Sequence, residues 1–351
     1  MSNVKKIQSA LGDLPALVMT DAVSIRYACG FHIDDGAAVI SRDGAWVVTD
    51  SRYVEAASAA IRDMRVLCTA PGRGVNVILG EIFAQNGLEK AGALPDRLTY
   101  AEWGRVEKAV GVPLVSAGDI LKDLRARKDQ TEVDSIVAAQ RIAEKALEEV
   151  LGLIRPGMTE KQIAAELVYR MYKYGGEGNS FDPIVVAGAK SSMPHGVPGD
   201  NVVRDGDFVT MDFGTLYNGY CSDMTRTVAV GHVTDEMRKV YDTVLEAQLA
   251  GIAAAAPGVV GRSIHDAAAK VIAGAGYGEY FGHGFGHGLG LEIHESPGAA
   301  GPDVLPEGAV ISAEPGIYLP GRFGVRIEDM LWLHDGGAEN LTKAPKDLII
   351  L

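Results

Sequence analysis

The chain has 351 residues, of which 47% are hydrophobic and 23% charged, and this near-average composition excludes a disordered or fibrous protein. Because a domain usually takes roughly 100 to 200 residues, we expect two domains. The formal net charge of -13 disfavours a nucleic-acid partner, since phosphate binding needs Lys and Arg in excess.

The first residues lack the features of a secretion signal. Their apolar run is broken by Asp13, and no small-residue cleavage site follows it. No segment of the chain approaches the roughly 18 consecutive apolar residues of a membrane span. The three cysteines are widely spaced and form no Cys-x-x-Cys pair, which suggests a reducing compartment. We therefore expect a cytoplasmic protein without a membrane partner.

Residues 1–125 predict a small α/β domain in which short apolar runs alternate with helical ones. The dipeptide Asp43-Gly44 predicts a hairpin turn, and the stretch RYVEAASAAI predicts a helix. We place the domain boundary in the charged segment at 125–128. No motif in this first domain predicts chemistry.

Residues 126–351 predict a second domain of helices and strands. A long helical pattern opens near Thr131, which lies three residues before Asp134 in the manner of a capping box. Further helices are bounded by the Pro156-Gly157 and Gly175-Gly176 turn signals. The remaining pattern predicts strands at 181–230, helices at about 235–256 and 263–274, and strands again from 284 onward.

Two hairpin-like segments each carry a pair of acids. In VTMDFGTLYNGYCSDMTRTVAV, a turn at Asn218-Gly219 pairs residue 212 with 225, so Asp212 and Asp223 project from one face. In AVISAEPGIYLPGRFGVRIEDMLWL, a loop centred on Gly321 places residue 314 opposite residue 328, and both are glutamates. Facing carboxylates repel unless a cation lies between them. The alternative, that these acids face solvent, leaves their apolar, β-rich surroundings unexplained.

Three histidines lie close together in the glycine-rich stretch GHGFGHGLGLEIHES: His283, His287 and His294. A lone histidine is more often structural, but three of the eight in the chain fall within this stretch. One imidazole and four carboxylates form a mostly oxygen-donor set, which suits Mn, Co or Zn and lacks the thiolates of a structural zinc site. The glycines do not follow the nucleotide-binding Gly-x-Gly-x-x-Gly spacing. The pattern therefore favours a two-metal hydrolytic site.

At these residues the chain resembles metallopeptidases of the creatinase and aminopeptidase P type, which share the pita-bread fold with methionine aminopeptidase. The matching motifs are SFDPIVVAGAKSSMPHG, MDFG, SDMTRT, HGFGHGLGLEIHES, EPGIY and RIED, with SIRYACGFH and VVTDSRY near the N-terminus. The resemblance implies an α/β (α+β) protein with a creatinase-like domain at 1–125 and a pita-bread catalytic domain at 126–351. In the second domain, helices would cover a curved antiparallel sheet. It also implies a homodimer.

The resemblance implies a dinuclear centre with two divalent metal ions (Mn, Co or Zn), in which Asp223 and Glu328 touch both ions. The ligands that it implies are Asp212, Asp223, His287, Glu314 and Glu328. Metal-activated water would attack the peptide carbonyl, and Glu314 would carry the proton to the leaving proline nitrogen.

The resemblance also implies roles for residues outside the ligand set. His195 and His294 would hold the substrate carbonyl or the tetrahedral intermediate, and His283 would support the pocket or bind substrate. Arg326 lies two residues before Glu328 and so shares its strand face; we expect it to orient a ligand carboxylate or the substrate. Its alternative is an ordinary surface arginine. Cys221 shares strand parity with the acid at 223, but a packed small hydrophobe is the favoured role.

The expected function is that of an Xaa-Pro aminopeptidase, which removes the N-terminal residue of a peptide when proline is second. The alternative is an Xaa-Pro dipeptidase (prolidase), which acts on dipeptides alone. Some prolidases place Arg directly after the His-Glu-x-Pro segment, whereas this chain has Gly298 there. A catalytically inactive binding module of the same fold is a third possibility, which the complete ligand set disfavours. The expected partners are proline-containing peptides or dipeptides.

Overall fold

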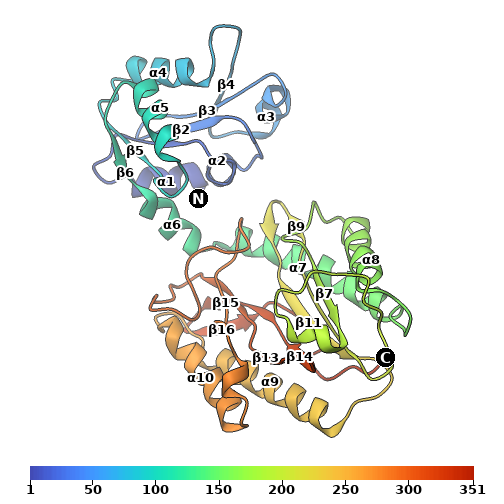
Figure 1. Ribbon diagram of the computed structural model, residues 1–351. Coiled ribbons are helices and arrows are strands. Elements are labelled where there is room, and N and C mark those ends of the chain that lie inside the picture. The colour runs from blue at the N-terminus through green and yellow to red at the C-terminus, as the bar shows by residue number, and fades with distance from the viewer. The chain divides into compact units, whose positions relative to one another are not determined.

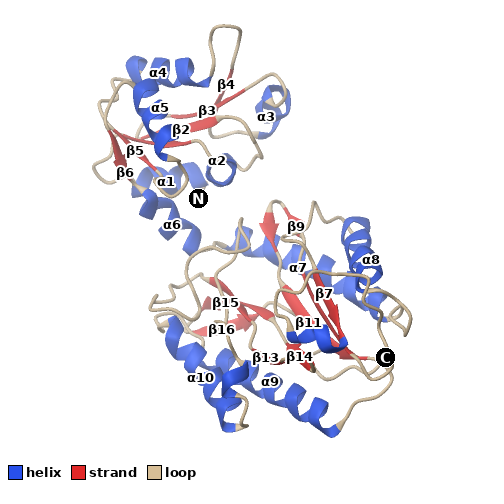
Figure 2. Ribbon diagram, in the orientation of Figure 1, coloured by secondary structure: helices blue, strands red, loops and turns tan.

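The computed structural model describes residues 1–351, which divide into two compact units at Met1–Arg125 and Ala126–Leu351 (Figure 1). Helices and strands alternate in the first unit, and the second pairs antiparallel strands with long helices (Figure 2). No helix in the chain is both long enough and apolar enough to cross a membrane.

The first unit is built on one six-stranded mixed sheet with strand order β4-β3-β2-β1-β5-β6. Its strands are β1 (Ala16–Met19), β2 (Ala37–Ser41), β3 (Ala45–Thr49), β4 (Arg65–Cys68), β5 (Ala91–Ala93) and β6 (Leu114–Ser116). Its helices are α1 (Asn3–Ala10), α2 (Ala22–Cys29), α3 (Val54–Ala60), α4 (Val75–Gln85) and α5 (Tyr100–Val110), and α6 (Gly118–Ala126) leads out of the unit. The predicted hairpin at Asp43-Gly44 joins the antiparallel strands β2 and β3.

The second unit contains four α-helices, two short 3-10 helices and ten strands. Its helices are α7 (Gln130–Leu151), α8 (Glu160–Lys173), α9 (Asp235–Ala254), α10 (Gly261–Gly274), η1 (Gly188–Ser192) and η2 (Gly278–Tyr280). Its first strands are β7 (Ile184–Ala187), β8 (Phe208–Phe213), β9 (Leu216–Tyr217), β10 (Tyr220–Cys221) and β11 (Met224–Ala229). The others are β12 (Val310–Ala313), β13 (Gly316–Leu319), β14 (Phe323–Arg326), β15 (Asp329–His334) and β16 (Gly337–Asn340).

All strand pairs of the second unit are antiparallel, in the orders β11-β8-β7, β12-β15-β16, β13-β14 and β10-β9. One apolar core joins α7 and α8 to β7, β8 and β11, and a second joins α9 and α10 to β12–β15. Each half of the unit therefore buries one strand group under one helix pair, as in a pita-bread fold.

The capping box of α7 lies two residues earlier than the sequence pattern predicted. The Asp129 carboxylate accepts a hydrogen bond from the Glu132 amide, and the Glu132 side chain accepts one from the Asp129 amide. Asp129 has the extended backbone of an N-cap, whereas Thr131 and Asp134 already lie within the helix. The prediction of a Thr131–Asp134 box was therefore wrong.

Residues 284–309 form loops, so the prediction of strands from 284 onward was wrong for this part of the chain. Its glycines lie against other backbone segments. A Cβ on Gly286 would lie 2.0 Å from the Ser312 carbonyl oxygen, and one on Gly288 would lie 2.5 Å from that of Glu295. The glycines therefore permit close backbone approach, which a β-branched strand sequence could not.

Candidate metal centre

The first pair of acids lies where β8 and β11 meet. The ladder pairs Asp212 with Thr225 and Phe213 with Met224, which is the register predicted from the Asn218-Gly219 turn. Asp223 immediately precedes β11, so both aspartates lie at one end of this strand pair. Their side chains are buried.

The second pair of acids lies at a break between two ladders. Ala313 pairs with Asp329 in the β12–β15 ladder, and Gly316 pairs with Arg326 in the β13–β14 ladder. The register is the same on both sides, so Glu314 and Glu328 stand opposite each other, as predicted. The Glu328 amide donates to the Thr225 carbonyl oxygen over 3.1 Å and so joins the two halves of the unit.

His287 reaches these acids from the glycine-rich loop. Its amide donates to Ser312 Oγ over 3.0 Å, and its carbonyl oxygen accepts from the Ser312 amide over 2.7 Å. Its Nε2 lies 3.5 Å from Asp223 Oδ2 and 3.4 Å from Glu314 Oε1. Its Nδ1 lies 3.2 Å from the Gly288 carbonyl oxygen and can donate to it, which turns the Nε2 lone pair toward the carboxylates.

The electrostatics of this cluster call for a cation. Burial, followed by the neighbouring carboxylates, raises the pKa of Asp223 and of Glu328 well above the usual range. Burial raises the pKa of Glu314 to about 7 and lowers that of His287 to about 4. Four carboxylates thus face one guanidinium, that of Arg326, which leaves an excess of negative charge whenever they ionise.

The donor set fits a divalent metal ion. Ligand atoms of Asp223, His287 and Glu328 all lie within 4.8 Å of one another. Asp212 Oδ1 is buried and accepts no hydrogen bond, although a buried acceptor normally has a partner. The neutral imidazole and the carboxylate oxygens suit Mn, Co or Zn. Each of these residues could therefore serve as a ligand.

A cavity of about 560 Å³ contains the acids and histidines. Every candidate site residue predicted from the sequence lines it, and no candidate lies elsewhere. They are His195, Asp212, Asp223, His283, His287, His294, Glu314, Arg326 and Glu328. Apolar side chains, including Phe181, Ile184, Val197 and Ile293, form much of the remaining wall. Such a wall, with a few polar groups converging on one side, is typical of a site for a small ligand.

Arg326 is buried and holds several parts of the cavity together, so it is not a surface arginine. Its Nη2 donates to Asp212 Oδ2 over 2.6 Å, and its Nε donates to Thr225 Oγ1 over 3.0 Å. Its Nη1 donates to Tyr318 Oη over 3.0 Å and to the Pro194 carbonyl oxygen over 3.2 Å. The guanidinium thus orients one acid directly and contacts the residue before His195.

Two hydroxyl residues in this network were not predicted. Thr225 Oγ1 donates to Glu328 Oε2 over 2.7 Å, and Tyr318 Oη lies 2.9 Å from His283 Nε2. Both could have been predicted from the pairing of residues across the two hairpins. Thr225 is the predicted partner of Asp212, and Tyr318 lies two residues from the partner of Arg326 and therefore on the same strand face.

The three other residues singled out near the cavity differ in environment. Burial lowers the pKa of His283 to about 4, and its Nδ1 can donate to the Gly284 carbonyl oxygen over 2.8 Å. The His294 ring lies 4.3 Å from that of His287, centre to centre, in an edge-on arrangement. Cys221 is buried, and burial raises the pKa of its thiol to about 12, so it packs as a small hydrophobe.

Comparison with known proteins gives two family matches. Residues 134–335 match metallopeptidase family M24, and residues 2–127 match the creatinase/prolidase N-terminal domain. The chain is 44% identical over 233 residues to an Xaa-Pro dipeptidase of Pyrococcus furiosus, covering 66% of this chain and 67% of that protein.

Two solved structures are similar over almost the whole chain. One is an Xaa-Pro dipeptidase from Bacillus anthracis, with a TM-score of 0.94 and 39% identity, covering 99% of both chains. The other is an X-Pro aminopeptidase from Thermotoga maritima, with a TM-score of 0.93 and 36% identity, covering 98% of this chain and 99% of that one.

Proposed function

Because the chain belongs to metallopeptidase family M24, we propose that it is a metal-dependent Xaa-Pro dipeptidase that cleaves the bond before proline. The observation that carries the proposal is the convergence of four carboxylates and the neutral imidazole of His287 on one cavity. The names of similar proteins, the dipeptidases of Pyrococcus furiosus and Bacillus anthracis, supply the proposed substrate class.

We assign two divalent ions, Mn, Co or Zn, to the cluster. The proposed ligands are Asp212, Asp223, His287, Glu314 and Glu328. When bound, such ions would lower the pKa of water and offset the negative charge that develops on the peptide carbonyl oxygen.

The chain's own residues then move the proton. Glu314 is the proposed general base and acid, since its buried carboxyl lines the cavity and its Oε1 lies 3.4 Å from His287 Nε2. The Ser312 hydroxyl donates to Glu314 Oε1 over 3.2 Å and fixes the direction of this carboxyl group. Glu314 would accept a proton from the attacking water and give it to the proline nitrogen.

Histidines on the surrounding loops would hold the substrate. His195 and His294 line the cavity and are exposed, so their ring nitrogens can reach the carbonyl oxygen of a bound peptide. His283 is more enclosed and is fixed by Tyr318, which suits it to support the pocket wall. Arg326 would keep the Asp212 carboxylate oriented.

An Xaa-Pro aminopeptidase is the second candidate function, and two observations favour it. The residue after the His-Glu-Ser-Pro segment is Gly298, which offers no cation for the free carboxylate of a dipeptide. The one arginine that lines the cavity, Arg326, already binds Asp212. A dipeptidase would need a cation from outside this lining. The similarity to the Thermotoga maritima aminopeptidase points the same way, whereas the dipeptidases are the more numerous of the relatives named above.

The test is hydrolysis of an Xaa-Pro dipeptide and of the matching Xaa-Pro-Xaa tripeptide. The full-length protein would be treated with a chelator and assayed before and after Mn, Co or Zn is restored. Glu314→Ala serves as the control for contaminating peptidases. We expect metal-dependent cleavage of the dipeptide, which the variant lacks.

Each other outcome has a defined meaning. Cleavage of the tripeptide in preference to the dipeptide would make the chain an aminopeptidase. Metal binding without cleavage of either peptide would contradict the proposed activity and leave a binding role. The homodimer belongs to the same proposal, and light scattering of the purified protein would test it.

A further inference from the structure

The loop that carries His195 connects β7 to β8 and has a well-fixed base and an exposed tip. At the tip, Pro194, His195 and Val197 line the catalytic cavity, and Val197 is 75% exposed. Within the tip, the Gly196 amide donates to the Met193 carbonyl oxygen over 3.1 Å. Gly196 is buried against Val186, but the side chains of Met193 and Val197 are exposed, so attachments from other segments must help to set the position of the tip.

The base of the loop is organised around Glu160, the first residue of α8, whose side chain is fully buried. Its Oε1 accepts hydrogen bonds from the Ala187 amide over 2.9 Å and from Asn201 Nδ2 over 3.0 Å. Its Oε2 accepts from the Gly199 amide over 2.9 Å and from Lys190 Nζ over 2.6 Å. Each oxygen of this carboxylate thus accepts two hydrogen bonds, which offset the free-energy cost of burying its charge.

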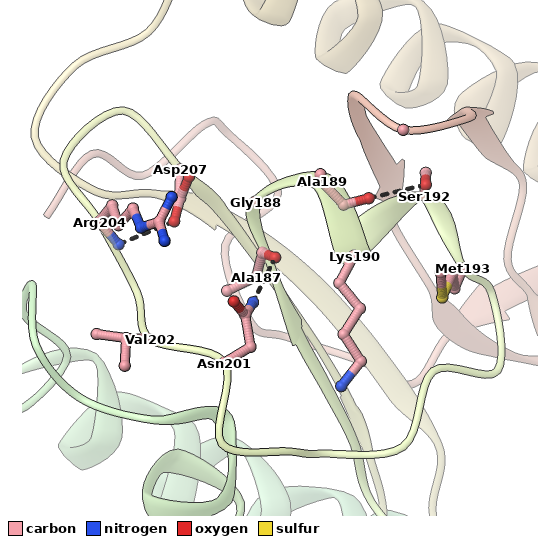
Figure 3. A pocket seen from close by; sticks show the side chains of 11 residues that line it. Ala187, Gly188, Ala189, Lys190, Ser192, Met193, Asn201, Val202, Arg204 and Asp207 are labelled. Atoms are coloured by element: carbon pink, nitrogen blue, oxygen red, sulfur yellow. Dashed lines mark hydrogen bonds between the residues drawn. The ribbon is translucent and has the colours of Figure 1, made fainter.

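Backbone contacts repeat this attachment. The amides of Glu160 and Lys161, at the start of α8, donate to the carbonyl oxygens of Asn201 over 3.1 Å and Gly199 over 3.2 Å. These amides have no partner within the helix, so the returning arm of the loop completes the helix N-terminus. Asn201 also donates to the Ala187 carbonyl oxygen over 3.0 Å, which closes the base (Figure 3).

Lys190 links this base to the tip. It extends from η1 beside a cavity of about 440 Å³ on the loop (Figure 3). Its Nζ donates to Glu160 Oε2 and, over 2.6 Å, to the carbonyl oxygen of Val197, two residues after His195. The backbone on the other side of His195 is held by Arg326, which donates to the Pro194 carbonyl oxygen over 3.2 Å. His195 therefore lies between two cationic attachments.

We propose that Glu160 and Lys190 form a positioning pair that sets the place of His195 in the catalytic cavity. The inference rests on the proposed function, in which His195 contacts the substrate. Neither residue of the pair lies among the side chains that line the catalytic cavity, so the pair acts through the loop. The pair would be needed for the transition-state contact of His195, and not for metal binding.

The first variant is Lys190→Met, which removes the attachment to Val197 and leaves three of the four donors to Glu160 in place. We expect kcat/KM on the Xaa-Pro substrate to fall by about tenfold, because misplacing a contacting group by a fraction of an ångström to 1 Å is costly. Glu160→Gln should cost about 100-fold, since its amide group would face a donor at either Gly199 or Ala187.

The matched control is Asp200→Asn. Asp200 lies on the same loop and pairs with Lys161 over 3.0 Å, but this pair is exposed. Exposed pairs contribute little, so kcat/KM should stay within about twofold of the wild type. The control separates the effect of the buried pair from that of any charge change on the loop.

Two readouts distinguish positioning from general destabilisation. Amide hydrogen exchange in the metal-free protein should become faster at 193–199 in Lys190→Met and Glu160→Gln, and stay unchanged in β8 and β11. In a His195→Ala background, Lys190→Met should cause no further loss of kcat/KM, because the residue through which it acts is gone. Metal affinity should match that of the wild type in all of these variants.

The proposal is overturned if exchange at 193–199 is unchanged, or if the Lys190→Met and His195→Ala losses are additive. Failure of the proposed function would look different, because no variant or wild type would cleave either peptide. In that case the exchange comparison alone would still decide whether the pair holds the loop. Should Glu160→Gln fail to fold, Lys190→Met carries the test.

Discussion

The acids and the histidines of the cavity are held by two different kinds of structure. Asp212, Asp223 and Glu328 are buried at strand ends, and Arg326 and Thr225 tie the side chains of Asp212 and Glu328 into one network. His195 and His294 lie on loops and are exposed. Strands can fix like charges at close range, whereas loops can adapt to a substrate. The buried strand acids, joined by His287 from the glycine-rich loop, are therefore suited to hold the proposed metal ions, whereas the exposed His195 and His294 are suited to contact a substrate.

Replacing a strand acid gives the largest expected effect. Glu328→Gln removes a charge from the proposed ligand set but keeps the shape of the side chain. Since the remaining donors cannot balance divalent ions as well, metal affinity should drop sharply and peptide cleavage should fall to the level of the chelated wild type. Calorimetric titration with Mn or Zn and a peptidase assay would measure both.

The pH dependence of stability tests whether Glu328 is protonated in the folded, metal-free chain. Burial and the neighbouring acids raise the pKa of Glu328 above its ordinary value of 4.5, so the folded metal-free chain retains a proton that the unfolded chain releases. Stability from this group is therefore complete below pH 4.5 and declines as the pH rises. Between pH 5 and 8 the Tm of the metal-free wild type should therefore fall by more than the Tm of metal-free Glu328→Gln. A steeper loss in the variant would contradict this assignment of charge.

Removing a loop histidine should separate turnover from metal binding. His195→Ala deletes the proposed contact with the substrate carbonyl but no proposed ligand. We expect kcat to fall by about 100-fold, the usual cost of losing one such donor, with metal affinity unchanged. Titration calorimetry beside steady-state kinetics would decide. A parallel loss of metal affinity would break the division between strand and loop residues.

The strand acids and the loop histidines also differ in how the sequence predicts them. The turn at Asn218-Gly219 and the loop at Gly321 gave the pairing of Asp212 with Thr225 and the facing of residues 314 and 328, because antiparallel register follows from turn position. The family motifs then identified the loop histidines. No local pattern revealed Glu160, since its four partners come from a loop more than twenty-five residues away in the chain. Its role follows from tertiary packing.

Arg326 joins the two kinds of structure, and its loss should have an intermediate effect. Arg326→Ala frees the Asp212 carboxylate and the Pro194 carbonyl oxygen at once. We expect activity to fall at least tenfold, which is about the lower end of the cost of losing a residue that orients a metal ligand. Arg326→Lys is the control, because a single ammonium cannot reproduce the forked contacts and should recover only part of the activity. Turnover equal to the wild type would show that the acids orient themselves.

The smallest expected effect tests whether a strand residue can act on a loop histidine. Tyr318 Oη lies between Arg326 Nη1 at 3.0 Å and His283 Nε2 at 2.9 Å. Because the pKa of His283 is about 4, its ring is neutral at pH 7, and Nε2 can accept the tyrosine proton while Nδ1 donates to Gly284. In Tyr318→Phe, His283 keeps its contact with the Gly284 carbonyl oxygen, and Arg326 keeps its other three hydrogen-bond partners.

The loss in Tyr318→Phe should therefore be one hydrogen bond, about 1 kcal/mol, or about fivefold in kcat/KM. Metal affinity should not change, since Tyr318 touches no proposed ligand. Kinetics of Tyr318→Phe, His283→Ala and the double variant would measure the coupling: if the tyrosine acts through His283, the double variant loses no more than His283→Ala alone. Additive losses would instead assign the tyrosine to Arg326, and its effect would then belong to the strand network that holds the acids.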